Sequence, residues 1–183
     1  TAFGARADAG KLRDLPDEDL SADLYADTQQ MCAEAGMVGY EISNHAVPGS
    51  ESRHNLIYWR QGDWAAVGPG AHSRITFPGC RVATEAERLP GAWLAAVEEA
   101  GSGEILRAPL PPQEQAVEYL LMGLRLAEGI DMDRYANLAG EPLRDAAVVR
   151  LEDLGLVQKT AGRLRTTEAG RPVLNAILRE LAA

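Results

Sequence analysis

Three prolines within four residues place the strongest constraint on the fold. Pro109, Pro111 and Pro112 lie in the segment RAPLPPQEQ. Proline lacks an N–H group and fixes φ, so neither a helix interior nor a central strand can continue through this segment. Proline-rich stretches also act as stiff spacers. We therefore predict two domains, 1–108 and 109–183, which a chain of 183 residues is long enough to form.

After this boundary, apolar residues recur with helical spacing. We expect a helix that starts near Ala116 and ends at Gly129, a short helix from Asp131 to Leu138, and a third helix over 143–154. LVQKTAGRLRTT predicts a tight hairpin with its turn at Ala161-Gly162, followed by a last helix capped by Thr167. This order of elements is typical of a winged-helix-like domain.

Before the boundary, the pattern indicates alternating helices and strands. Residues 1–14 show no period and are expected to form a loop, and a helix should run from Pro16 to Gly36. Short strands are predicted at 38–43 and 55–60, and a further helix at 92–99. A helix followed by a strand is the repeating unit of α/β sheets and barrels. The predicted fold class is therefore α/β plus α.

Charge and composition limit the classes of partner. The net charge is −9, whereas proteins that bind the phosphate backbone of nucleic acids are usually basic. Lys159, Arg163 and Arg165 form only a small basic patch, so we expect no nucleic-acid partner, although a binding module of the winged-helix type stays an alternative. No apolar run spans a bilayer and no signal peptide opens the chain. Two cysteines agree with a reducing compartment, so we expect a cytoplasmic location.

One short segment concentrates residues that carry chemistry. ESRHNLIYWRQGD places His54, Asn55, Tyr58 and Trp59 within six residues, although the chain has three histidines and three tryptophans in all. Imidazole can ligate a metal or haem iron, and Tyr and Trp offer flat apolar surface to a planar ring system. The alternative is a strand whose aromatic side chains pack in the core, with His54 satisfied by the backbone.

A glycine-rich turn follows in VGPGAHS. Gly68 and Gly70 permit close approach of the backbone, so this loop could offer N–H groups to an anion or nucleotide, or it could be a plain tight turn. Glu41 and Asp63 are candidate acid–base groups, and we expect the Glu41 side chain to face solvent. The spacing of His and Cys residues favours no zinc site.

These residues lie in a longer stretch that resembles a known family. YEISNHAVPGSESRHNLIYWRQGDWAAVGPGAHSRI is similar to the C-terminal half of radical-SAM proteins related to oxygen-independent coproporphyrinogen III oxidase. HNxxYW at 54–59 and GPGAH at 68–72 are the specific parts, and they resemble the haem-chaperone branch more than the oxidase branch. LLMGLRLAEGID, LEDLGLV and GRLRTTEAGRPVLNAIL resemble the winged-helix-like C-terminal domain of this family.

The resemblance implies a fold and a set of ligands. Residues 1–108 would form the closing part of a partial (β/α) radical-SAM barrel and its extension, followed by the winged-helix-like domain. The full parent would bind SAM, a [4Fe–4S] cluster and haem or porphyrin, and would pass haem to a membrane acceptor protein. The implied residues fall into two groups: Gly68, Gly70 and Ala71 near SAM, and His54 as ligand to haem iron, with Asn55, Tyr58 and Trp59 beside the macrocycle and His72 as a second candidate. A fragment of a true oxidase, which decarboxylates propionates with a SAM-derived radical, is the alternative.

The sequence departs from the family in one respect. The cluster of such proteins is held by CxxxCxxC, whereas Cys32 and Cys80 are isolated here. The resemblance therefore implies a C-terminal fragment that contains no catalytic residue and cannot cleave SAM. Strands that lack their barrel neighbours would expose their edges, so we also expect the fragment to self-associate.

Overall fold

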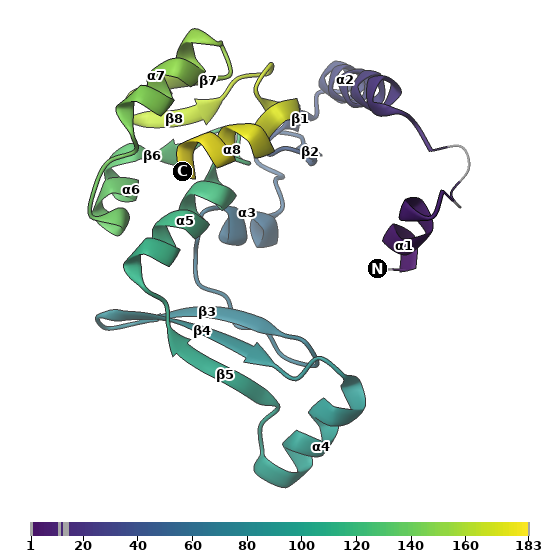
Figure 1. Ribbon diagram of the computed structural model, residues 1–183, viewed down its shortest axis with the longest axis vertical. Helices are drawn as coiled ribbons and strands as arrows, with labels where there is room; N and C mark the ends of the chain where they lie inside the picture. The colour runs from purple at the N-terminus through teal and green to yellow at the C-terminus, as the bar shows by residue number, and fades with distance from the viewer. Residues whose placement is uncertain (1, 11, 13–14, 183) are drawn as a thin grey trace.

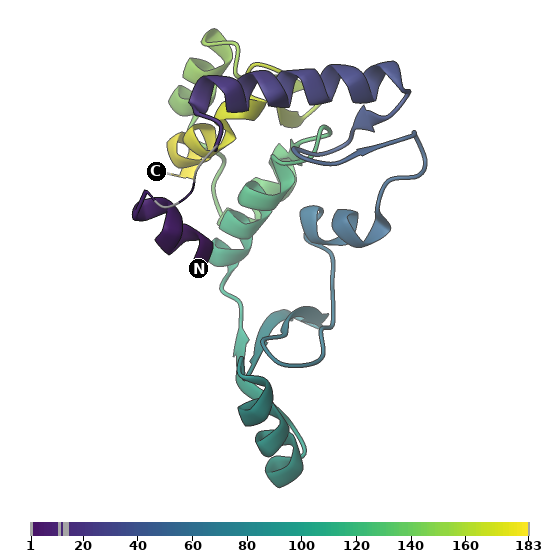
Figure 2. The same ribbon diagram turned by 90° about the vertical axis from the view of Figure 1, so that its right-hand side faces the viewer.

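The structure is a computed structural model that describes residues 2–10, 12 and 15–182. Figures 1 and 2 show a group of helices and short strands, with a separate sheet extending away from it. The elements in chain order are α1 (Ala2–Asp8), α2 (Glu18–Glu34), β1 (Val38–Gly39), β2 (His45–Ala46), α3 (Arg53–Trp59), β3 (His72–Phe77), β4 (Cys80–Ala86), α4 (Pro90–Ala100), β5 (Glu104–Pro109), α5 (Pro112–Gly123), β6 (Ile130–Asp131), α6 (Met132–Ala139), α7 (Asp145–Asp153), β7 (Val157–Thr160), β8 (Arg163–Thr166), η1 (Arg171–Val173) and α8 (Leu174–Ala182).

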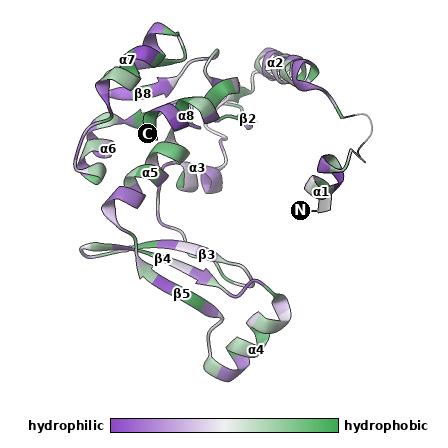
Figure 3. Ribbon diagram, viewed as in Figure 1, coloured by the Kyte–Doolittle hydropathy of each residue, from purple (hydrophilic) through white to green (hydrophobic). Residues whose placement is uncertain are grey.

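The hydrophobic core lies after the proline segment. Helices α5, α7 and α8 pack around a three-stranded sheet of order β6-β8-β7. Leu120, Ile130, Leu164 and Ile177 are completely buried there. Burial of each such side chain contributes roughly 1.5–3 kcal/mol, so this cluster is the main source of stability. Figure 3 shows hydrophobic and hydrophilic segments alternating along the helices that enclose it.

The proline segment separates a strand from a helix. Strand β5 ends at Pro109, and α5 starts at Pro112 with Pro111 at its N-cap. Proline suits the first helical position because the N–H group that it lacks would have no partner inside the helix. The prolines thus mark the change from strand to helix, while the division into two domains at this point stays a prediction. Helix α5 ends at Gly123 and not at Gly129. The chain turns back at 124–129 to reach β6.

The second sheet is antiparallel and has the order β3-β4-β5. His72 pairs with Glu85 and Phe77 with Cys80 across the β3–β4 hairpin. These strands were not expected from the sequence, because their apolar residues are few and do not alternate strictly. Helix α4 follows β4 and lies at the far end of the sheet (Figure 2). It agrees with the helix predicted at 92–99.

Gln61 connects this sheet and α3 to the C-terminal helices. Its side chain is 3 % exposed and its backbone has φ +54°, which is unfavourable for any residue but glycine. The Nε2 group donates to the carbonyl of Gln115 at 2.6 Å, and Oε1 accepts from Arg134 at 3.2 Å. Arg74 on β3 adds a two-pronged ion pair with Glu118 on α5, at 2.7 Å.

Two predictions for the first half are wrong. Residues 55–59 of the predicted strand 55–60 belong to the helix α3, which Ser52 caps by accepting from the Asn55 N–H at 3.3 Å, and Arg60 is its C-cap. A short apolar run does not distinguish a helix from a strand, and here the cap decides. Residues 2–8, expected in a loop, form α1, while residues 1, 11, 13 and 14 lie outside the described part.

The remaining predictions before the boundary hold in part. Helix α2 starts at Glu18, where the Asp17 carboxylate accepts from the Leu20 N–H at 2.8 Å. Its apolar residues do not reach the core: Leu24 is 50 % and Met31 69 % exposed. Of the strand predicted at 38–43, only β1 forms, and it pairs with β2.

The C-terminal elements agree closely with the sequence. Asp131 caps α6 by accepting from the Arg134 N–H at 2.8 Å. Thr167 does not cap the last helix as expected: its Oγ1 accepts from the Gly170 N–H at 3.1 Å in the turn before η1, and α8 begins at Leu174. The hairpin β7–β8 turns at Ala161 (φ +51°) and Gly162 (φ +78°). Two consecutive residues with positive φ are the signature of the turn that matches the twist of paired strands.

This turn yields a prediction for stability. We expect Ala161→Gly to raise the free energy of unfolding by up to about 1 kcal/mol, because glycine adopts positive φ without steric penalty. Gly162→Ala should lower it by a similar amount, although a Cβ at Gly162 would meet no atom within 4 Å. Urea denaturation of the two variants and the wild type provides the measurement. A loss of stability in Ala161→Gly would contradict this account of the turn.

Candidate functional site

Helix α3 brings two of the predicted residues together. His54 and Tyr58 are one turn apart and meet edge to face, with ring centroids 4.7 Å apart. The Tyr58 ring in turn contacts Trp64, at 4.6 Å between centroids. We call His54, Tyr58 and Trp64 the aromatic row. His54 is exposed at one end of it, and Tyr58 and Trp64 are half-buried.

Trp64 is the site residue that sequence reasoning missed. Its indole N–H donates to the carbonyl of His72 at 2.9 Å, and its backbone exchanges hydrogen bonds with Arg74 at 2.8 and 3.0 Å. Strand β3 thus holds Trp64, the member of the aromatic row that does not lie on α3. Trp64 lies ten residues after His54, and the scarcity of tryptophan in this chain was the signal available to find it.

Two arginines flank Trp64. The guanidinium carbons of Arg74 and Arg81 each lie 5.8 Å from the centre of the Trp64 ring system. Contacts of this kind stabilise by about 0.5–2 kcal/mol, depending on how well water is excluded. Arg81 is 8 % exposed, and burial lowers the pKa of its guanidinium, with Asp63 and Glu118 acting in the opposite direction. The row therefore ends on positive charge in an acidic chain.

Asn55 and Trp59 lie on another face of α3. The Asn55 amide donates to the Tyr40 hydroxyl at 3.3 Å. Trp59 packs beneath Arg125, whose guanidinium lies 5.3 Å from its ring centre. The Trp59 indole N–H is buried and meets no acceptor in the described part of the chain. The four residues of the predicted cluster are thus divided between two faces, as helical geometry requires.

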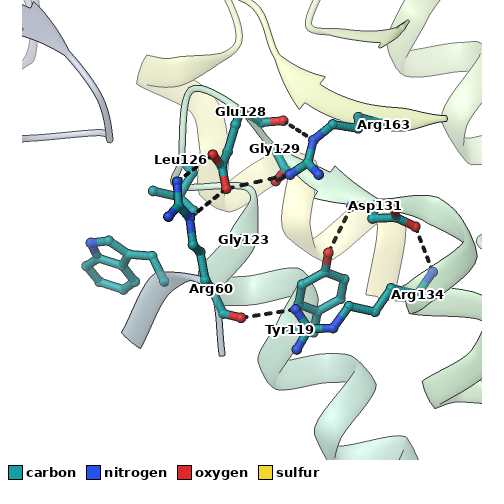
Figure 4. Close-up of a pocket in the computed structure, with 10 residues that line it drawn as sticks. Arg60, Tyr119, Gly123, Leu126, Glu128, Gly129, Asp131, Arg134 and Arg163 are labelled. Atoms are coloured by element: carbon teal, nitrogen blue, oxygen red, sulfur yellow. Dashed lines mark hydrogen bonds and ion pairs between the residues drawn. The ribbon is translucent and has the colours of Figure 1, made fainter. Parts of the chain in front are cut away.

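The Trp59 face lines a small pocket, shown in Figure 4, of about 280 Å³. Arg60 forms a two-pronged ion pair with Glu128 at 2.8 and 2.9 Å, and Arg163 donates to the carbonyls of Glu128 and Gly129. Arg60 and Arg163 are therefore largely used by the protein itself, whereas Arg134, which also lines this pocket, donates only to neutral acceptors. This arrangement makes it a structural contact between α3 and the C-terminal domain.

Two N–H groups of the glycine-rich loop, those of Gly70 and Ala71, already form hydrogen bonds within the protein. Gly68 and Gly70 have φ of +107° and +69°. The Gly70 N–H donates to Glu87 O at 2.7 Å, and the Ala71 N–H to Gly68 O at 3.2 Å. Gly68 and Ala71 also line a pocket of about 280 Å³ next to Trp93. An anion at this loop would have to displace those internal bonds, and the contact with SAM stays a prediction.

His72 lies apart from His54, at the start of β3. It is exposed, and its Nδ1 lies 3.7 Å from the carboxylate of Glu85, its partner across the strands. Among the described residues, no three His, Cys, Asp or Glu side chains gather in a way that could hold a metal ion. What this site offers a metal is therefore the exposed imidazole of His54.

Glu41 does not face solvent, contrary to expectation. It is 1 % exposed, and Oε1 accepts from the Ser43 N–H and hydroxyl, both at 3.1 Å, and from the Asn44 amide. Its backbone forms a bridge to Leu126 at the end of the α5 segment. Of the expected strand only Val38–Gly39 form, so Glu41 lies in the turn that follows. Its carboxylate is bound there by the donors of Ser43 and Asn44.

Asp63 organises the other end of the site. The Thr76 N–H and hydroxyl both donate to its carboxylate at 2.8 Å, and Arg81 donates at 3.0 Å. Burial opposes ionisation, but these bonds outweigh it and lower the pKa of Asp63 from its ordinary value of 3.8. A lowered pKa stabilises the fold above the ordinary value, and this contribution is lost as pH falls through the folded-state value.

This interaction predicts a dependence on pH. Asp63→Asn should be less stable than the wild type at pH 7, because it leaves the buried charge of Arg81 without its partner. The difference between the two proteins should shrink as pH falls from about 4 through the lowered folded-state pKa of Asp63, because the wild-type carboxylate then also becomes neutral. Urea denaturation at pH 7 and pH 3 gives the comparison. An equal difference at both pH values would exclude the proposed role of the carboxylate charge.

Comparisons with known proteins agree with the family resemblance. Residues 110–173 match the family described as HemN C-terminal domain. The chain is 30 % identical to the haem chaperone HemW of Escherichia coli K12, over 97 % of this chain and 45 % of that protein. It is 34 % identical to HemW of Mycobacterium tuberculosis H37Rv, over 99 % and 44 %, and 34 % identical to the bovine mitochondrial radical S-adenosyl methionine domain-containing protein 1, over 91 % and 40 %.

A solved structure shares the fold. It is described as coproporphyrinogen III oxidase (HemN) from Escherichia coli, a radical SAM enzyme, and matches with a TM-score of 0.70 at 16 % identity. The match covers 94 % of this chain and 44 % of that one. The chain thus spans less than half the length of these relatives. Over this span the chain is similar to the C-terminal portion of the HemW haem chaperones, and its residues 110–173 match the HemN C-terminal domain.

Proposed function

We propose that this chain is the haem-contacting C-terminal part of a radical-SAM haem chaperone, and that the aromatic row is where the tetrapyrrole binds. The observation that carries the proposal is the exposed imidazole of His54 at the end of stacked rings. Haem iron requires a single axial side chain, and an exposed histidine can supply it. Tyr58 and Trp64 provide flat apolar surface next to it.

The names of the relatives favour a chaperone over a true oxidase. Proteins 30–34 % identical to this chain are named haem chaperones, whereas the oxidase is matched at 16 % identity, a level that supports likeness of fold alone. On this proposal the parent binds haem or porphyrin in the cytoplasm and delivers haem to a membrane acceptor protein. None of the described helices has the length and apolarity to cross a membrane, which agrees with a separate acceptor.

The parent's architecture completes the proposal. Residues 1–108 form the closing part of the partial (β/α) barrel and its extension, and residues 109–183 a winged-helix-like domain, supported by helices α5 to α8 and the β7–β8 hairpin. Gly68, Gly70 and Ala71 lie toward SAM in the parent. SAM and the [4Fe–4S] cluster belong to the parent, because no CxxxCxxC motif occurs in this sequence. The chain alone therefore does not cleave SAM, and no catalytic residue is assigned to it.

Haem titration tests the role of His54. We expect His54→Ala to weaken haem binding at least about tenfold, roughly 1.4 kcal/mol, and to shift the Soret band, because the axial ligand is lost. His45→Ala is the matched control, since His45 is held by Gln29 at 3.0 Å and lies outside the aromatic row. Equal affinity and equal Soret spectra for His54→Ala and the wild type would remove His54 from the proposal.

We further propose that the chain self-associates in solution. Val38 in the two-stranded β1–β2 pair is 57 % exposed, and α2 carries Leu24 and Met31 exposed on its surface. Pairing of such surfaces between copies would bury apolar area worth about 25 cal/mol per Å². Light scattering should show a mass above that of the monomer, and Leu24→Glu should lower it. A monomeric mass for the wild type at high concentration would refute this proposal.

A further inference from the structure

An open cleft of the described chain lies between the β3–β4 hairpin and the C-terminal helices, and it shares Arg81 with the Trp64 end of the aromatic row. It has a volume of about 590 Å³. One wall is formed by the hairpin with Phe77 and Arg81, another by the proline segment 109–112, and the third by Arg134 and Leu138 of α6. We call it the Arg134 cleft. No function assigned above uses it.

The walls of the cleft combine apolar surface with positive charge. All of its lining residues lie within the described range 61–138, and none of them is acidic although the chain as a whole carries a net charge of −9. The Arg81 guanidinium is largely satisfied by Asp63 and by the carbonyl of Gly62, at 3.0 and 2.7 Å. It therefore supplies positive potential and few free donors.

Arg134 is different, because it retains donors. Its Nη groups donate one bond each, to Arg60 O at 3.1 Å and Gln61 Oε1 at 3.2 Å, and both acceptors are neutral. The carboxylate of Asp131 accepts from the backbone N–H of Arg134. The guanidinium stacks at 4.3 Å over the buried ring of Tyr119, which fixes its orientation (Figure 4). Among the described residues, no carboxylate forms an ion pair with it.

We infer that the Arg134 cleft binds a carboxylate carried on an apolar body, with the acid group on Arg134 and the apolar part against Phe77, Leu138 and the prolines. A guanidinium of fixed orientation favours the two oxygens of a carboxylate. A phosphate group fits the cleft less well. Phosphate sites recruit backbone N–H groups, often at a helix N-terminus, and the prolines at 111 and 112 remove two of those donors from the start of α5.

Two sources could present this chemistry: the propionate of a tetrapyrrole, or a small free acid. The first rests on the proposed function and the second does not. We would titrate the 183-residue chain with 4-phenylbutyrate, mesoporphyrin and mesoporphyrin dimethyl ester, in which the acids are blocked. Weakening of the porphyrin diacid but not of its diester by Arg134→Gln identifies the tetrapyrrole. Weakening of phenylbutyrate alone identifies a free acid.

The variants isolate the guanidinium. Arg134→Gln should weaken binding of the carboxylate probe about tenfold or more, because a charge-assisted bond is lost. Arg134→Lys should restore part of the affinity, and Arg179→Gln, the same change of charge on the exposed side of α8, should leave it unchanged. His54→Ala should not alter phenylbutyrate binding. If His54→Ala leaves haem binding unchanged while Arg134→Gln weakens binding of the carboxylate probe, the haem proposal fails and the Arg134 cleft stands as a separate site.

The two cysteines give an independent readout that does not depend on a variant folding. Cys80 lines the cleft, whereas Cys32 lies on α2, and both are free thiols of intermediate exposure. A saturating probe should slow alkylation of Cys80 several-fold and leave the rate of Cys32 unchanged. If Arg134→Gln binds every acid as tightly as the wild type, or if no acid protects Cys80, the inference is overturned.

Discussion

The buried side chain of Gln61 is the contact on which the arrangement of this protein depends. It follows α3 directly, and it reaches α5 through the carbonyl of Gln115 and α6 through Arg134. A buried amide without hydrogen-bond partners would destabilise the fold by roughly 1–3 kcal/mol. Both bonds are therefore needed for this conformation to persist. The positive φ of Gln61 turns the chain sharply after α3 and thereby sets the positions of Asp63 and Trp64. The placement of the aromatic row and of the Arg134 cleft follows from this turn.

How much of the fold could be predicted depends on whether local signals were sufficient. The C-terminal elements follow largely from caps and turn residues that act within a few positions: Asp131 and the Ala161-Gly162 pair have the expected role, whereas Thr167 holds the turn before η1 and does not cap α8. The strands β3 to β5 could not be predicted in the same way, because Ile105 on β5 is 59 % exposed and the sheet has no continuous apolar face to leave a pattern. Their pairing is set by register between segments, which local sequence does not encode.

The candidate site shows the same division. The sequence identified His54 and Tyr58, but it placed Tyr58 on a strand at 55–60 with His54 just before it, an arrangement in which the two rings would not meet. The helix capped by Ser52 brings those rings into contact and turns Asn55 and Trp59 away. Trp64 and the arginines around it could be found only from tertiary structure, because they reach the row from a different element. Scarce residues in one segment thus indicated the candidate site, and the fold determines which side chains lie together there.

The sheet β3-β4-β5 has a consequence for how the molecule fluctuates. It contributes no residue to the C-terminal core cluster, and it is held to that core mainly through Gln61, the Arg74–Glu118 pair and the proline segment. Segments with few buried apolar contacts open at lower free energy than the global transition. We therefore expect the sheet and α4 to open as a cooperative unit of their own. Their amide protons should exchange with solvent when this unit detaches, while those of Leu120 and Ile177 should exchange only on complete unfolding.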